Sequence, residues 1–274
     1  MKKSCFFLFF FVILFTISGC ETKQENFSEK RYESSVKTKP AQLEKKVESE
    51  TFCEEISATP NFNKERLLKL PPPKRKKLFI SIITPAVLKA NCIIEKERKV
   101  FLKIKGKIES GKQLTEKEKQ LLEKLKKNYE SNDLNELYYR INTLPPSIVI
   151  AQAAIESGWG TSRFFIEGNN LFGIWTFSNS TEHIKAKYGK AKVKKYKSPL
   201  YSIEDYYHNI NTGWAYEELR KARLKTKDPL ILADYLKNYS ILREEYVRRI
   251  KRVITKNNLQ KFDKCTYTNC TIDL

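Results

Sequence analysis

The apolar positions of this chain recur mainly every three to four residues, which is helical spacing. The first long stretch, residues 74–112, has its apolar positions at Phe79, Ile82, Ile83, Val87, Leu88 and Ile94. Pro85 lies inside it, so we expect that helix to be bent or broken there. The next stretch begins with Thr115 and Glu118 at capping-box spacing. Both stretches predict scaffold helices.

The segment from residue 134 to 160 predicts two further helices. Pro145 and Pro146 end the first and pre-set the first turn of the second, and Gly158 is placed to terminate it. Glu156 falls in the last turn, four residues after Gln152.

Beyond residue 169 the pattern changes. Residues 185–198 alternate basic with small or aromatic residues around Gly189, which predicts a short, solvated β-hairpin. Three helical segments follow, and no period of 20–50 residues recurs. The chain is therefore expected to hold one mainly α domain of the α+β class, with about 200 residues and an adequate core.

The first twenty residues predict an export signal. Lys2 and Lys3 precede an apolar stretch that is too short to span a bilayer, and the ending Ile17-Ser18-Gly19-Cys20 resembles the lipobox of bacterial lipoproteins. An ordinary secretory signal is the alternative. With Glu21 following, we expect Cys20 to be lipidated and to anchor the chain in an outer membrane, facing the periplasm.

We divide the chain into a signal (1–20), a flexible tether (21–60), a catalytic domain (61–262) and a Cys-containing tail (263–274). Residues 21–60 are polar and charged without apolar periodicity, as in a tether.

The formal net charge is +20, and it remains +18 without the signal, which holds two lysines and no acid. Such a charge indicates an anionic partner. No nucleic-acid motif is present and an exported chain does not normally meet nucleic acid, so anionic cell wall or lipid fits better. Seven lysines and no acid between residues 185 and 197 would attract the wall polymer.

Four cysteines remain after the signal, an even number for an oxidising compartment: Cys53, Cys92, Cys265 and Cys270. Of three possible pairings we favour Cys53–Cys92 with Cys265–Cys270. Zinc is disfavoured because neither His183 nor His208 lies at ligand spacing from a cysteine pair. We expect no metal and no other cofactor.

Glu156 is the candidate for chemistry. A carboxylate near the negative end of a helix, among apolar neighbours, has a raised pKa. A carboxyl group that is protonated at neutral pH is what the general acid of a glycosidase requires. The alternative is an ordinary surface glutamate near a helix end.

The residues around Glu156 carry a resemblance. The stretch "AQAAIESGWGTSRF" followed by "EGNNLFGIW" resembles the signature of bacterial peptidoglycan glucosaminidases of glycoside hydrolase family 73, specifically the bacterial Bax-like proteins, and the similarity extends over about residues 65–255. It implies a lysozyme-like fold with the hairpin beside the active-site cleft. It also implies hydrolysis of the β-1,4 bond after N-acetylglucosamine in wall glycan strands. The general acid maps onto Glu156, and a tyrosine that shapes the sugar site maps onto Tyr206, with Tyr207 as the alternative.

Five other residues are candidates for binding substrate. Trp159, Phe172 and Trp175 could stack on sugar rings, although Phe172 fits a core position equally well. Asn170 could hydrogen-bond an N-acetyl or hydroxyl group, while Asn169 shapes the turn. Ser157 could position Glu156 or cap the helix end.

The second carboxylate is not evident. Family members often place an acid on the hairpin, where this chain has Lys192-Val193-Lys194, and Glu182 is the only acid between Asn169 and Ile203. Either Glu182 acts as base, or the 2-acetamido group of the substrate assists, or hydrolysis is crippled. Glu204 and Asp205 resemble surface charges. A muramidase, a lytic transglycosylase and a non-catalytic wall-binding lipoprotein remain alternatives.

Overall fold

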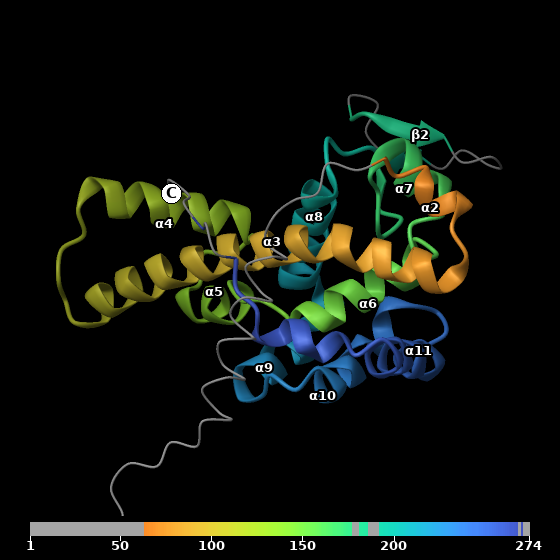
Figure 1. The fold of residues 1–274 in the computed structure, drawn as a ribbon. Helices are drawn as coiled ribbons and strands as arrows, with labels where there is room; N and C mark the ends of the chain where they lie inside the picture. The colour runs from red at the N-terminus through yellow and green to blue at the C-terminus, as the bar shows by residue number, and fades with distance from the viewer. Residues whose placement is uncertain (1–62, 177–180, 186–191, 268–269, 271–274) are drawn as a thin grey trace, which may run out of the picture.

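The structure is a computed structural model, and it describes residues 63–176, 181–185, 192–267 and 270 (Figure 1). The predicted signal, Cys20, the tether and Cys53 lie outside these residues, as does Gly189 at the predicted hairpin turn.

The described part is mainly helical. Its elements in chain order are α2 (Arg66–Lys69), α3 (Pro72–Glu109), α4 (Glu116–Asn128), α5 (Leu134–Arg140), α6 (Pro146–Glu156), α7 (Arg163–Gly168), β1 (Trp175–Thr176), β2 (His183–Lys185), β3 (Lys192–Lys194), α8 (Pro199–Thr212), η1 (Trp214–Tyr216), α9 (Glu217–Lys225), α10 (Pro229–Ala233), η2 (Asp234–Tyr239), α11 (Glu244–Lys256) and η3 (Leu259–Lys264).

The long helix α3 is the central helix of the fold. It runs across the molecule, with α4 folded back along one end and α6 and α8 packed against it (Figure 1). Of the predicted bend or break near Pro85, the break is wrong, because α3 continues through this residue. By length and composition alone α3 could cross a membrane, but 61% of its most apolar window is buried inside the protein. It is therefore a core helix.

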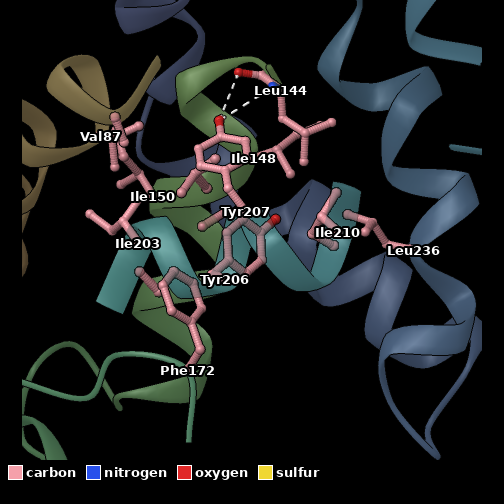
Figure 2. Packing of buried hydrophobic residues seen from close by; sticks show 14 of the residues in the cluster. Val87, Leu144, Ile148, Ile150, Phe172, Ile203, Tyr206, Tyr207, Ile210 and Leu236 are labelled. Carbon is pink, nitrogen blue, oxygen red and sulfur yellow. Dashed lines mark hydrogen bonds between the residues drawn. The ribbon is translucent and has the colours of Figure 1, made fainter. Parts of the chain in front are cut away.

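Helices α6 and α8 form the centre of the core. Figure 2 shows Tyr206 and Tyr207 of α8 among aliphatic side chains of α3 and α6, including Ile148, which is fully buried. Burying one large apolar side chain contributes roughly 1.5–3 kcal/mol. The Tyr207 hydroxyl donates to Asn91 Oδ1 on α3 and accepts from the Leu144 amide, so its polar atom is satisfied.

The sheet has three antiparallel strands in the order β1-β3-β2. Val193 on β3 lies opposite Trp175 on one side and Ile184 on the other, and both Val193 and Ile184 are buried. The predicted hairpin corresponds to β2 and β3. The sequence pattern did not predict β1, because two residues are too short to show a period of two.

This combination of packed helices and one small antiparallel sheet confirms the predicted fold class, a mainly α domain of the α+β class with a short β-hairpin. The capping box at Thr115 and Glu118 is also present, with reciprocal bonds between the two residues.

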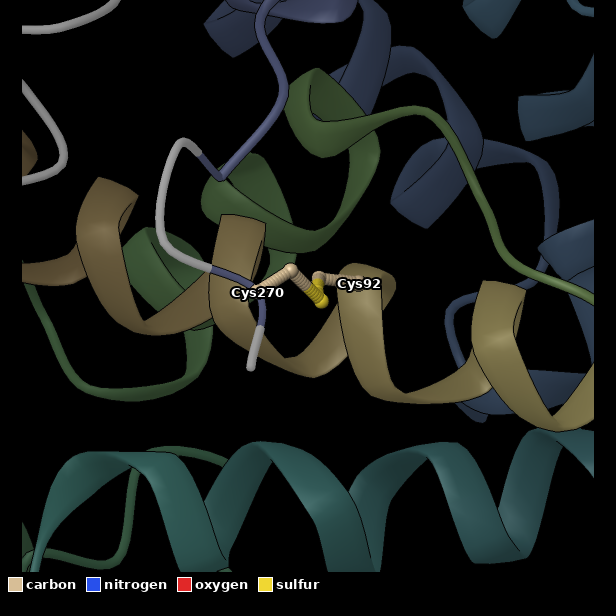
Figure 3. Close-up of a disulfide and its surroundings, with 2 residues drawn as sticks. All are labelled: Cys92 and Cys270. Carbon is tan, nitrogen blue, oxygen red and sulfur yellow. A yellow bond between two sulfur atoms is a disulfide. The ribbon is translucent and has the colours of Figure 1, made fainter. Parts of the chain in front are cut away.

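The favoured disulfide pairing is wrong. Cys92 on α3 is bonded to Cys270, with the two Cα atoms 6.2 Å apart (Figure 3). Cys265 is also disulfide-bonded. Buried Leu259 and Phe262 hold η3 against the core, and the tail then returns to α3. Closeness in sequence favoured the short Cys265–Cys270 loop, whereas packing brings together cysteines that are 178 residues apart.

Candidate active site

Glu156 is the last residue of α6 because the chain turns sharply after it. The Trp159 amide donates to the Ala154 carbonyl (2.8 Å) and the Gly158 amide donates to the Ile155 carbonyl (3.3 Å), which is the Schellman pattern. Gly158 has a φ of 58°, in the left-handed region that favours glycine. The prediction that Gly158 terminates this helix is confirmed, and the turn leaves the carboxyl group at the helix end.

The Glu156 carboxylate has one protein partner among the described residues. Tyr246 of α11 donates its hydroxyl hydrogen to Glu156 Oε1 over 2.7 Å. Burial raises the pKa of Glu156, and the hydrogen bond from Tyr246 partly opposes that rise. The predicted direction of the pKa shift is confirmed. A half-buried carboxyl group with a raised pKa keeps its proton to a higher pH than an exposed one, which is the property that a general acid needs.

A chain of buried hydrogen bonds extends behind Glu156. Gln152, one turn earlier on α6, donates from Nε2 to the Tyr246 hydroxyl oxygen (3.0 Å). Tyr206 of α8 donates its hydroxyl to Gln152 Oε1 (2.6 Å). Three helices therefore fix the orientation of the group that contacts Glu156, because each hydroxyl and the amide has a defined partner.

Aromatic rings surround this chain of hydrogen bonds. Tyr239 at the end of η2 stacks on Tyr246 with ring centroids 5.5 Å apart and planes 6° apart. Phe172 stacks on Tyr206 at 4.3 Å. Burial, and then the negative charge of Glu156, raise the pKa of the Tyr239 hydroxyl. Tyr239 is partly exposed next to Glu156, so it offers an aromatic surface to a sugar ring.

The structure corrects the tyrosine assignment. Tyr206 is 1% exposed and Tyr207 is 2% exposed, and both hydroxyl groups bond to protein atoms within the core. Tyr246 is the tyrosine that contacts Glu156. Its position in the sequence did not reveal this, because Tyr246, Ile250 and Ile254 recur every four residues, as core positions do.

The two polar candidates for substrate contact are both bonded to backbone groups, and for Ser157 the predicted alternative of a helix cap is confirmed. Ser157 is fully buried, where its hydroxyl donates to the Ala153 carbonyl and accepts from the Gly160 amide, so it caps the helix end. Asn170 donates from Nδ2 to the carbonyls of Ile174 and Lys194 and accepts at Oδ1 from the Ile174 amide. Its amide group joins the turn to β3 and has no hydrogen left for a sugar.

The three aromatic candidates have different environments. Phe172 is 6% exposed and belongs to the core. Trp159 packs edge-on against Phe79 of α3 at 5.9 Å and lies under the Lys76 ammonium, so its contacts lead to α3. Trp175 on β1 is 58% exposed and is available for stacking.

The sheet side has no carboxyl group comparable to Glu156. The Glu182 side chain is 80% exposed and lies 3.9 Å from the Lys195 ammonium. Asp205 of α8, which resembled a surface charge, accepts bonds from Lys194 (2.7 Å) and Tyr196 (2.6 Å), so it ties β3 to α8. In the described ranges neither acid has a hydrogen bond or ion pair with the residues around Glu156.

Clusters of metal ligands are absent from the described residues, where no three or more His, Cys, Asp or Glu lie together. The arrangement can therefore supply one proton donor, a fixed hydroxyl beside it and aromatic surfaces.

Comparisons with known proteins indicate which class of protein this chain resembles. Residues 132–259 match the glucosaminidase family model, described as mannosyl-glycoprotein endo-beta-N-acetylglucosaminidase. The chain is similar to Protein bax of Escherichia coli (strain K12), at 30% identity over 183 residues that cover 63% of this chain and 66% of that protein. It is also similar to the exo-glucosaminidase LytG of Bacillus subtilis (strain 168), at 27% identity over 154 residues that cover 50% and 52%.

Among solved structures, the catalytic domain of the autolysin Auto from Listeria monocytogenes superposes with a TM-score of 0.44 and 18% identity, over 83% of this chain and 99% of that one. The matched regions span just under two thirds and about half of the two curated relatives. The matched family model and the relative LytG carry glucosaminidase names. Residues 132–259 therefore match the glucosaminidase family, and the chain is similar to Bax-like proteins.

Proposed function

We propose that this protein is a peptidoglycan hydrolase that cleaves the β-1,4 glycosidic bond after N-acetylglucosamine, with Glu156 as the general acid. One observation carries the proposal. Glu156 is half-buried with a raised pKa, and its carboxylate is oriented by the Tyr246 hydroxyl at 2.7 Å. The match of residues 132–259 to the glucosaminidase family model supports the choice of reaction.

In the proposed reaction, Glu156 gives its proton to the glycosidic oxygen as the bond to the sugar carbon breaks. Tyr246 holds the carboxyl group in place, and its hydrogen bond stabilises the negative charge that remains on the carboxylate. Retaining glycosidases place a second carboxylate about 5–5.5 Å from the first. Because Glu182 is exposed and paired with Lys195, we favour attack by the 2-acetamido oxygen of the substrate on the sugar carbon. Water then enters at the same carbon, the bond to the acetamido oxygen breaks, and the Glu156 carboxylate takes the proton of the water.

The test is digestion of purified peptidoglycan by the wild-type protein, Glu156→Gln and Glu182→Gln, followed by mass spectrometry of the new ends. We expect new reducing-end N-acetylglucosamine from the wild type and from Glu182→Gln. Glu156→Gln should lose about a hundredfold or more in rate, because it lacks the proton while keeping the shape of the side chain.

Other outcomes would identify other functions. Reducing N-acetylmuramic acid would indicate a muramidase, and the anhydro form would indicate a lytic transglycosylase. Binding to wall sacculi without any soluble fragment would indicate a wall-binding protein, an alternative that Lys192 and Lys194 at the expected acid position favour. A Glu156→Gln variant that digests wall at nearly the wild-type rate would show that the acid is misassigned.

We also propose that the protein works in the cell envelope, anchored by lipid on Cys20 to the outer membrane and facing the periplasm. Residues 21–60 would act as the tether that lets the domain reach the glycan strands. The lipobox-like ending Ile17-Ser18-Gly19-Cys20 supports this. Cys20→Ala should no longer partition into the detergent phase, whereas unchanged partitioning would disprove lipid attachment at this residue.

A further inference from the structure

A groove of about 680 Å³ lies between the first turns of α3 and the end of α11 with η3. Its apolar part is formed by Pro72, Pro73 and Ile80 of α3 and by Phe262 of η3. These helices are distant in sequence, and the groove exists because α3 begins beside the place where α11 ends.

The charge around this groove has one sign. Four lysines line it, Lys76 and Lys77 from α3 and Lys256 and Lys261 from the other side, and no Asp or Glu is among its described lining residues. The positive end of the α3 dipole lies at Pro72, and it adds to the potential of the lysines. An occupant of this groove must therefore carry negative charge.

The groove is separate from the candidate active site. Glu156, Tyr246 and Tyr239 are not among its lining residues. Lys76 connects the two regions, since its ammonium lies 4.9 Å from the centroid of the Trp159 ring. A ligand that draws Lys76 toward itself would change the surroundings of Trp159, which provides an optical signal for occupancy.

We propose that this groove binds one anionic membrane lipid, with the phosphate among the lysines and the first part of an acyl chain on the apolar surface. Charge complementarity selects a negative head group, and the surface of Pro72, Ile80 and Phe262 selects an attached hydrocarbon chain. The carboxylates of a wall polymer satisfy only the first condition. The proposal does not depend on the hydrolase activity.

The experiment uses the purified full chain and dihexanoyl phosphatidylglycerol below its micelle concentration, so that single lipid molecules are measured. Binding is followed by calorimetry and by tryptophan fluorescence. We expect affinity about tenfold or more above that for dihexanoyl phosphatidylcholine, because the zwitterionic head group lacks the net charge. Inorganic phosphate tests the charge of the head group without an acyl chain, and it should bind more weakly than the anionic lipid.

Two sets of variants locate the site. Changing Lys76, Lys77 and Lys256 together to Gln should weaken phosphatidylglycerol binding about tenfold or more. The matched control changes three exposed lysines at the far end of α3 and the start of α4, Lys103, Lys112 and Lys117, and it removes the same charge. The control should change affinity by less than about twofold, since charges beyond ~10 Å are screened at 0.1 M salt.

A third variant distinguishes the contribution of the acyl chain of the lipid from that of its charged head group. Ser81 is exposed and lines the groove, so Ser81→Phe should fill part of it, weaken lipid binding and leave phosphate binding unchanged. Circular dichroism checks that every variant is folded. The proposal is overturned if the control triple loses as much affinity as the groove triple, if phosphatidylcholine or phosphate binds as tightly as phosphatidylglycerol, or if Ser81→Phe has no effect on lipid binding.

Discussion

The two sides of the candidate site differ in how deeply their side chains are buried and in how many hydrogen bonds hold them. On the helical side, Glu156, Gln152, Tyr246 and Tyr206 form one series of hydrogen bonds across α6, α11 and α8, and three of the four residues are almost fully buried. On the sheet side, Trp175 is 58% exposed and the side chain of Glu182 is 80% exposed. The proton donor is therefore oriented by the core, whereas the sheet presents side chains that are free to adapt to a substrate.

This difference follows from the cost of burying polar groups. A buried hydroxyl or amide without a partner costs roughly 1–3 kcal/mol, so the helical side holds its geometry only while every member is paired. The exposed residues of the sheet exchange protein partners for water at little cost. We therefore expect substitutions on the helical side to change both stability and the pH profile, and substitutions on the sheet side to change neither.

Among the residues that support Glu156, the largest effect should come from Tyr246→Phe. The variant removes the hydroxyl that orients Glu156, and we expect the hydrolysis rate to fall about ten- to a hundredfold. The hydrogen bond from Tyr246 favours the charged carboxylate, so its loss should raise the pKa of Glu156 further. The alkaline limb of the pH–rate profile should therefore move to higher pH. The measurement is the rate of wall digestion against pH.

Tyr239→Phe is the control for that experiment. It keeps the ring stacked on Tyr246 and leaves the hydrogen bond to Glu156 in place. Its rate should fall less than that of Tyr246→Phe. If Tyr246→Phe keeps the wild-type alkaline limb, the Tyr246 hydroxyl does not set the protonation of the acid.

A smaller effect is expected for Tyr206→Phe, three hydrogen bonds from Glu156. It leaves Gln152 Oε1 buried without its donor, and we expect a loss of about 1–3 kcal/mol in the free energy of unfolding. Tyr207→Phe is the matched control, because it breaks bonds to Asn91 and Leu144, which do not belong to the series that reaches Glu156. Urea unfolding should show comparable losses for both, and only Tyr206→Phe should alter the pH–rate profile. Equal profiles would show that Tyr206 is purely structural.

The next effect is a gain in stability. Because the folded-state pKa of Glu156 is raised above the ordinary value of 4.5 for a glutamate, the folded protein binds this proton more tightly than the unfolded chain does. Stability is therefore lost as pH rises from 4.5 through the folded pKa. Glu156→Gln does not titrate, so its melting temperature should exceed that of the wild type by a few degrees near neutral pH and by much less near pH 4. An equal difference at both pH values would contradict the burial argument.

Local signals in the sequence were sufficient for much of this fold. The capping box at Thr115, the helix stop at Gly158 and the position of Glu156 in the last turn each depend on residues within one or two turns. The family signature lies within such a stretch, which is why the general acid could be proposed from the sequence.

The rest depends on contacts between distant residues. Tyr246 lies 90 residues after Glu156, and Cys92 bonds to a cysteine 178 residues later, so no local pattern pairs them. Asn170 has the chemistry of a sugar contact, and only the fold reveals that three backbone groups already use its amide. Residue type indicates what a side chain can do, and packing decides which of these possibilities is realised.

The smallest effect should come from Glu182→Gln, which tests the sheet side directly. Glu182 is exposed, and its ion pair with Lys195 at 3.9 Å is of the surface kind that contributes little. If the substrate's acetamido group attacks, the variant should keep its rate within about twofold and its melting temperature unchanged. The control is Glu167→Gln, an exposed glutamate that pairs with Arg163 on α7. A loss near that of Glu156→Gln, absent from the control, would instead mean that β2 moves Glu182 toward the substrate and that the sheet supplies the second carboxylate.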